Sequence, residues 1–401
     1  MASATPASGG APLHVLLTGD CVGGVWTYLL DLAGGLSAAG IRTTLAVLGP
    51  KPPSSTCKEA RRIPGLTLIP TGLGLDWTAA DRHEVIGAAG ALSWLARDVG
   101  ADLVHLHSAA YAGLASFHAP VVVGCHSCVS TWWTATHGSS LPPDLAWRAV
   151  LMSHGIAAAD DAIAPSRAFA RATAAAYGLR VEPTVVLNGR AHASALHPEI
   201  KIRHFLGSQC EGGEAGTSVP TIDEVAAFTA GRLWDVGKNL LALDAAAPRA
   251  GLPILAAGDL AGPNGAAVTL PNLRCLGRLS AAEIAACLAA RPIFVSSALY
   301  EPFGLAVLEA AAAGCPLVLS DIPTFRELWD GAAVFVDPRD PDAIAAALRR
   351  LAGSADERKA LSTRAAARAD SYGVDRMVAG TLAVYRRVLR ADRCPDQSLV
   401  A

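Results

Sequence analysis

Short apolar runs alternate with helical patterns rich in alanine and leucine along almost all of this 401-residue chain. The helical patterns of the first half lie near 24–39, 78–98, 144–159 and 166–177. The runs between them that we expect to form strands are Leu13–Thr18, Arg42–Leu48, Leu66–Pro70, Asp102–His107, Pro120–Gly124, Asp161–Ala164 and Thr184–Leu187. Strands are this uniformly apolar when helices cover both faces of their sheet. The alternation therefore predicts an α/β fold with a doubly wound parallel sheet.

The alternation stops at 207–220, a stretch rich in Gly, Ser and Glu whose composition is typical of a flexible linker. It then restarts, and the chain ends in helical patterns from 356 to about 392. The expected strands of this second half are Val225–Thr229, Ile254–Ala257, Leu273–Leu276, Ile293–Ser296, Leu317–Ser320 and Val334–Val336, with helices near 239–249, 280–290, 305–313 and 341–352. We therefore predict a first domain over 1–205, a linker over 206–221, a second domain over 222–375, and a C-terminal helix and tail over 376–401.

Composition excludes several classes of protein. The chain has 33 basic and 35 acidic residues, a net charge of −2, which argues against a nucleic-acid partner. The most apolar stretches, 239–257 and 304–320, are interrupted by charged residues, Gly and Pro, so we expect no membrane span. Nine cysteines without framework spacing, and an N-terminus without the apolar core of a signal peptide, favour reduced thiols in a cytoplasmic protein.

The segment 296–316 carries the strongest chemical signal. It starts where an expected strand ends, and Pro302 marks the approach to a helix that begins near Gly304. The free N–H groups of such a helix start form a natural phosphate site. Glu301 precedes this helix, and Glu309 lies a little over one turn inside it, in an apolar run where a carboxylate needs a partner. We expect both carboxylates to face one ligand; the alternative is a first-turn carboxylate and a solvated helix residue.

A second chemical signal follows the strand expected at 225–229. Arg232 and Lys238 lie six residues apart there, and two cations at a strand end suit a diphosphate. Lys238 as a solvated side chain entering a helix is the structural alternative.

These motifs, in their order along the chain, resemble those of the retaining glycosyltransferases of family 4, and the resemblance extends from about residue 13 to 392. Its most specific part is Glu301-x7-Glu309 with the upstream Gly-Arg-Leu and Lys. The supporting motifs are the Gly23-Gly24 turn, the DLVHLH run at 102–107, the strand that ends in His126, APS at 164–166, LNG at 187–189, and Gly314–Asp321 followed by Glu327.

The resemblance implies the GT-B fold, in which two Rossmann-like doubly wound domains face each other across a cleft. The first domain would take the acceptor, the second would bind the nucleotide-sugar, and a C-terminal helix would cross back to the first domain. The implied catalytic residues are His126, Arg232, Lys238 and Glu301. The implied donor-binding residues are Gly23, Gly24, Arg232, Lys238, Leu279, Glu301, Phe303, Gly304, Leu305 and Glu309.

Each implied role has a physical reason. Arg232, Lys238 and the backbone N–H groups at Gly304 would hold the donor diphosphate and its developing negative charge. Glu309 would accept hydrogen bonds from the ribose hydroxyls and Glu301 from those of the transferred sugar, with His126 beside that sugar. Gly23 and Gly24 would let the backbone of the first domain approach closely.

The function that the resemblance implies is metal-independent hexosyl transfer with retention. The donor would be a UDP-, GDP- or ADP-sugar, the acceptor a glycan, a lipid or a small molecule, and no cofactor is expected. Two alternatives are a nucleotide-sugar epimerase of the same architecture and a binding protein that keeps the fold without turnover. The sequence identifies neither the nucleobase, nor the sugar, nor the acceptor.

Two departures from the family pattern stand out. The family usually spaces its Arg and Lys by five residues, whereas Arg232 and Lys238 are separated by six. Arg190 follows Asn188-Gly189 where valine is commoner, and the sequence offers no reason for it.

Other features leave alternatives open. Trp132 and Trp133, in a long loop expected after His126, either stack on an acceptor sugar or pack that loop. Asp340 and Asp342 form an Asp-x-Asp string that we expect to cap a helix rather than bind a metal. The C-terminal helix carries Arg386, Arg387, Arg390 and Arg393, which predict either a peripheral contact with anionic lipid at the inner membrane surface or a solvated helix face.

Overall fold

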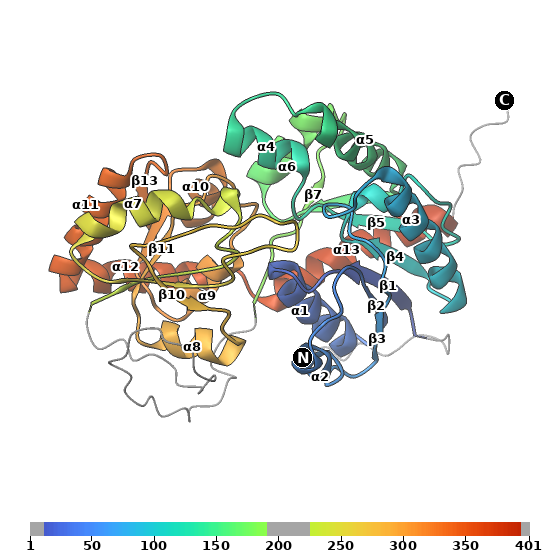
Figure 1. Cartoon of the computed structure of the whole chain (residues 1–401). Helices are drawn as coiled ribbons and strands as arrows, with labels where there is room; N and C mark the ends of the chain where they lie inside the picture. The colour runs from blue at the N-terminus through green and yellow to red at the C-terminus, as the bar shows by residue number, and fades with distance from the viewer. Residues whose placement is uncertain (1–11, 191–224, 394–401) are drawn as a thin grey trace, which may run out of the picture. The chain divides into compact units, whose positions relative to one another are not determined.

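The computed structural model describes residues 12–190 and 225–393, which form two compact units (Figure 1). The first unit holds the described residues up to Cys125, together with 150–163 and the described residues from Val378 onward. The second holds 126–149 and the described residues of 164–377. This division differs from the expected boundary, because the second unit takes two segments that precede residue 205. The expected linker, 206–221, lies outside the described residues.

The first sheet has the predicted parallel character. Its strand order is β3-β2-β1-β4-β5-β6-β7, and each neighbouring pair whose register is described is parallel. The strands are β1 (His14–Gly19), β2 (Arg42–Val47), β3 (Leu66–Pro70), β4 (Leu103–Leu106), β5 (Val121–Gly124), β6 (Asp161–Ala164) and β7 (Thr184–Val185). The helices of this part of the chain are α1 (Gly24–Ala38), α2 (Ser54–Ala60), α3 (Arg82–Asp98), α4 (Val129–His137), α5 (Pro143–Ala158) and α6 (Arg167–Tyr177).

The second sheet is parallel throughout, in the order β10-β9-β8-β11-β12-β13. Its strands are β8 (Ala227–Ala230), β9 (Ile254–Ala257), β10 (Arg274–Gly277), β11 (Ile293–Ser296), β12 (Leu317–Ser320) and β13 (Val334–Val336). The helices are α7 (Leu240–Ala250), α8 (Ala281–Ala289), α9 (Leu305–Ala312), α10 (Pro323–Trp329), α11 (Pro341–Gly353), α12 (Ala355–Ala369) and α13 (Val374–Arg393), of which α13 belongs to the first unit from Val378 on.

Alternate residues of the second sheet face two separate cores. Phe228 and Phe294 belong to a core shared with α9, α10 and α12, whereas Ala227 and Val295 belong to one shared with α7 and α11. Successive side chains of a strand point to opposite faces, so a strand that is apolar at every position needs helices on both. The predicted doubly wound α/β fold with two domains is confirmed.

The prediction of a long loop after His126 is wrong, because residues 129–137 form helix α4. Its sequence, VSTWWTATH, is rich in Thr, Ser and Trp, which have modest helix propensity. The helix packs against α6, and Gly138 ends it in the left-handed conformation with φ 65°. Tertiary packing thus outweighs local propensity in this segment.

Among the residues that the structure describes, no helix combines the length and the apolar character that a membrane span requires.

The order of the second sheet places two loops side by side. Strands β8 and β11 are neighbours, and the order of the strands reverses between them. In open α/β sheets, ligands bind beyond the carboxyl ends of the strands at such a switch point. The loop after β8 carries Arg232 and Lys238, and the loop after β11 carries Glu301.

Candidate functional site

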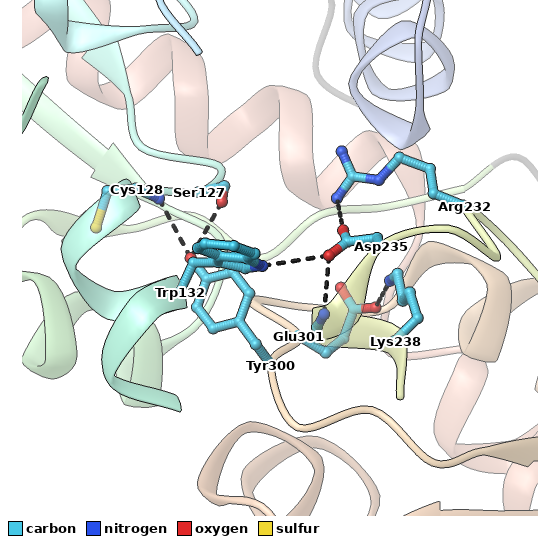
Figure 2. Close-up of polar contacts among 9 residues, drawn as sticks. Ser127, Cys128, Trp132, Arg232, Asp235, Lys238, Tyr300 and Glu301 are labelled. Atoms are coloured by element: carbon cyan, nitrogen blue, oxygen red, sulfur yellow. Dashed lines mark hydrogen bonds and ion pairs between the residues drawn. The ribbon is translucent and has the colours of Figure 1, made fainter. Parts of the chain in front are cut away.

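Backbone hydrogen bonds and an ion pair connect the loops after β8 and β11. The backbone N–H groups of Leu299 and Tyr300 donate to the carbonyl oxygen of Gly237 over 2.9 and 3.1 Å. One residue further along each loop, the Lys238 ammonium forms an ion pair with the Glu301 carboxylate (Figure 2). The Lys238 side chain is 24% exposed and that of Glu301 is 15% exposed. A cation and a carboxylate therefore meet at the switch point, partly open to solvent.

Asp235 organises the loop between the two cations. Its Oδ2 accepts a hydrogen bond from a guanidinium nitrogen of Arg232 over 2.7 Å. Its Oδ1 accepts from the Gly237 N–H over 2.9 Å and from the Trp132 indole N–H over 3.2 Å (Figure 2). The Gly237 contact caps a 3₁₀ turn over Val236–Lys238. This turn accommodates the six-residue spacing and still brings Lys238 to Glu301.

The end of the same loop is fixed by Asn239. Its φ of 55° places it in the left-handed region, and its side-chain amide donates to the carbonyl oxygens of Ser297 over 3.0 Å and Pro338 over 2.7 Å. The Ser297 hydroxyl donates back to the Asn239 carbonyl over 3.0 Å. A residue held away from its preferred backbone region is kept there by several contacts at once. Lys238 is thus attached to a rigid support.

Gly304 precedes helix α9 in a conformation that other residues avoid. Its φ is 93°, and a Cβ there would lie 3.1 Å from Phe325 Cε1 and 3.4 Å from Glu301 Cγ. The chain before it is held by the Ser166 hydroxyl, which donates to the Pro302 carbonyl over 2.7 Å. The first N–H groups of a helix lack partners within it, so the start of α9 offers donors beside Glu301.

His126 follows β5 and is half-buried. Burial lowers the pKa of His126 to about 4, so the imidazole is neutral at physiological pH. Tyr300, which precedes Glu301, reaches the residues that follow His126: its hydroxyl accepts from the Cys128 N–H over 3.2 Å and lies 3.2 Å from the Ser127 hydroxyl (Figure 2). His126 and Glu301 therefore flank one hydrogen-bonded contact.

Comparison with known proteins identifies the family. The family model described as Glycosyltransferase Family 4 matches residues 22–191, and that described as Glycosyl transferases group 1 matches residues 267–368. The chain belongs to the family 4 type of glycosyltransferase. The predicted GT-B fold is confirmed as well, because the neighbours among solved structures are GT-B glycosyltransferases.

Relatives of this glycosyltransferase differ in how much of it they match. D-inositol 3-phosphate glycosyltransferase of Streptomyces bingchenggensis is 26% identical over 96% of this chain and 88% of its own length. O-antigen chain mannosyltransferase B of Escherichia coli is 30% identical, but the match covers 28% of this chain and 30% of that protein. The crystal structure of Anabaena HepE in complex with UDP-glucose has a TM-score of 0.66 at 18% identity, over 93% of this chain and 100% of that one.

The other expected donor-binding residues are described within their own units. The Phe303 side chain is 3% exposed and packs edge-on against Tyr372, with ring centroids 5.8 Å apart, so only its backbone is left for a donor. Leu279 precedes α8 and packs against the same core. Gly23 and Gly24 begin helix α1 in the first unit.

Asp235 and Tyr300 were missed from the sequence, which left the role of Trp132 open. Asp235 lies between the two cations in the sequence, but its role depends on the folded turn. Tyr300 and Trp132 act through partners far away in the chain. Of the two tryptophans left open, Trp132 contacts Asp235, whereas Trp133 stacks on His137 with ring centroids 3.8 Å apart.

Glu309 has the partner that its apolar surroundings require. Arg190, the unexplained departure from the family pattern, places a guanidinium nitrogen 3.0 Å from Glu309 Oε1. Both side chains are partly accessible to solvent: that of Arg190 is 24% exposed and that of Glu309 is 28% exposed.

The remaining motifs have structural roles. Asp340 caps α11 by accepting from the Asp342 and Ala343 N–H groups, as predicted. The Glu327 carboxylate accepts from the Arg167 and Ala168 N–H groups at the start of α6. Within residues 12–190 and 225–393, no three His, Cys, Asp or Glu side chains are grouped to hold a metal ion, and no disulfide joins the seven cysteines.

Proposed function

We propose that this chain is a retaining glycosyltransferase that moves a hexosyl group from a nucleotide-sugar donor. The observation that carries the proposal is the convergence of Arg232, Lys238 and the start of α9 at the switch point of the second sheet. Two cations and a helix N-terminus match the charge of a nucleoside diphosphate. A UDP-sugar is the first donor to test, since HepE was crystallised with UDP-glucose.

The chemistry follows from where charge develops during transfer. When the bond from the anomeric carbon to the donor oxygen breaks, negative charge collects on the departing diphosphate, where Lys238 and Arg232 stabilise it. Asp235 fixes the Arg232 guanidinium in advance, so little reorganisation is needed. Glu301 accepts hydrogen bonds from the hydroxyls of the sugar, and the neutral His126 imidazole would lie beside that sugar.

Metal independence is part of the proposal. Cations supplied by side chains perform the task that a divalent ion performs elsewhere. We expect turnover to be unchanged after dialysis against EDTA. Loss of turnover that Mg²⁺ or Mn²⁺ restores would contradict this part alone.

The assay that tests the proposal follows release of the nucleoside diphosphate. The protein is incubated with UDP-, GDP- and ADP-sugars, with and without a panel of sugar, inositol phosphate and lipid acceptors. Release that depends on an acceptor supports transfer, and proton NMR of the new linkage reports retention. An isomerised sugar nucleotide without an acceptor would favour the epimerase alternative, and binding without turnover would favour a binding protein.

A cytoplasmic location with peripheral membrane contact is the final part of the proposal. On helix α13, Arg386 and Arg390 are exposed, while Arg387 donates from Nε to Asp161 Oδ2 over 2.9 Å. Sedimentation with phosphatidylcholine vesicles, with or without phosphatidylglycerol, measures this contact. Binding to the anionic vesicles that Arg386→Ala and Arg390→Ala together reduce is expected; no binding to either would leave a solvated helix face.

A further inference from the structure

Arg190 is attached to the second unit by its backbone. Its N–H donates to the Tyr372 carbonyl over 3.0 Å, and it forms a parallel bridge with Gly373. The two segments approach so closely that a Cβ on Gly189 would lie 2.3 Å from the Gly373 carbonyl oxygen. The Tyr372 ring in turn packs on Phe303, and its hydroxyl donates to the Leu328 carbonyl over 2.8 Å. The position of the Arg190 backbone is therefore set by the core beneath the start of α9.

From this anchor the Arg190 side chain reaches the second carboxylate of the site. Its guanidinium nitrogen lies 3.0 Å from Glu309 Oε1, as Lys238 pairs with Glu301. A carboxylate has about four acceptor positions, and the Glu309 side chain is 28% exposed, so the ion pair is compatible with hydroxyl donors at the same carboxylate.

We propose that Arg190 is a positioning residue of the donor site, holding the Glu309 carboxylate in the orientation that accepts the ribose hydroxyls of a nucleoside diphosphate. This inference rests on the proposed function. The planar guanidinium both balances the charge of the carboxylate and fixes its orientation. A flexible ammonium balances the charge but holds the orientation less well.

The experiment compares a ribose with a ribose that lacks its hydroxyls. Calorimetry first identifies which of UDP, GDP and ADP the wild-type protein binds tightest, and that base is used as the diphosphate and as its 2′,3′-dideoxy analogue. We expect Arg190→Gln to weaken binding of the diphosphate about tenfold, the effect of losing one charge-assisted hydrogen bond. Binding of the dideoxy analogue should be unchanged, since it has no hydroxyls for Glu309 to accept.

Four further variants sharpen the test. Arg190→Lys should restore part of the affinity, and Arg190→Gln combined with Glu309→Gln should bind no worse than Glu309→Gln alone. In turnover, Arg190→Gln should raise the donor KM and leave kcat nearly unchanged. Arg249→Gln removes an exposed ion pair with Asp342 in the same unit and is the matched control, with wild-type values expected throughout.

The outcomes separate this inference from the proposed function. If the wild-type protein binds no nucleoside diphosphate, the proposed function is contradicted. If it binds the diphosphate and the dideoxy analogue equally tightly, the inference is overturned and donor binding still stands. An equal loss for both ligands in Arg190→Gln would also overturn it, as would a lower melting temperature with an unchanged preference for the ribose.

Discussion

The Trp132 indole nitrogen donates over 3.2 Å to Asp235, the same carboxylate that holds the Arg232 guanidinium over 2.7 Å. Asp235 is only 9% exposed, so each of its hydrogen bonds has a large effect on its orientation. A residue of helix α4 therefore takes part in placing a cation of the proposed donor site.

We expect Trp132→Phe to lower kcat about tenfold, because a lost hydrogen bond to a buried carboxylate costs about 1.5–3 kcal/mol and frees Arg232 to move. Trp133→Phe is the matched control. Its indole nitrogen donates to the exposed Ser139 hydroxyl, so steady-state rates should stay at wild-type values. Equal effects in the two variants would show that α4 matters only as a helix.

Gly304→Ala tests the left-handed turn before α9. The new Cβ would lie 3.1 Å from Phe325 Cε1 and 3.3 Å from Val307 Cγ2, which is closer than ordinary contacts, so the turn that follows Glu301 must shift. We expect a stability loss of about 1–3 kcal/mol together with a fall in kcat of at least about tenfold. Gly331→Ala has a similar φ, 77°, with nothing within 4 Å of the new Cβ. It should lose stability and keep its kcat, which separates backbone strain from displacement of the site.

The neutral state of His126 predicts how stability depends on pH. Its pKa is about 4 in the folded protein and 6.5 in the reference state, so the unfolded chain binds the proton first as the pH falls. Its contribution is complete above pH 6.5 and decreases as the pH drops toward 4. His126→Gln should reduce the slope of the urea midpoint against pH over this window. The exposed His137→Gln serves as control, and the same slope in both would contradict burial as the cause.

Much of the fold could be predicted because its signals are local. The expected bounds of Ile254–Ala257 and Leu317–Ser320 are those of β9 and β12, since apolar runs between turn residues define buried strands. Helix α4 could not be predicted from VSTWWTATH, because its stability comes from packing.

The candidate site, like the fold, could be predicted only where its signals are local in the sequence. Glu301 and Glu309 were found by their spacing around one helix start, and Lys238 by its place after a strand. The partners of these residues could not be found from spacing or from a place after a strand. Trp132 and Asp235 are 103 positions apart, and no periodicity links Arg190 to Glu309. Contacts distant in sequence depend on the order of strands and on the packing of the helices, which single-residue patterns do not encode.

The ion pair of Lys238 and Glu301 gives the most direct prediction. Lys238→Ala removes the charge that we propose stabilises the departing diphosphate, and we expect kcat to fall at least about 100-fold, as for removal of one donor to a developing anion. Glu301→Gln keeps the shape but weakens the hydrogen bonds to the sugar and releases Lys238 from its partner. It should also lower kcat strongly, with the fold kept. Asp342→Asn, at the exposed pair with Arg249, should match the wild-type protein. Circular dichroism verifies folding, and wild-type rates in both site variants would refute the assignment of the donor site.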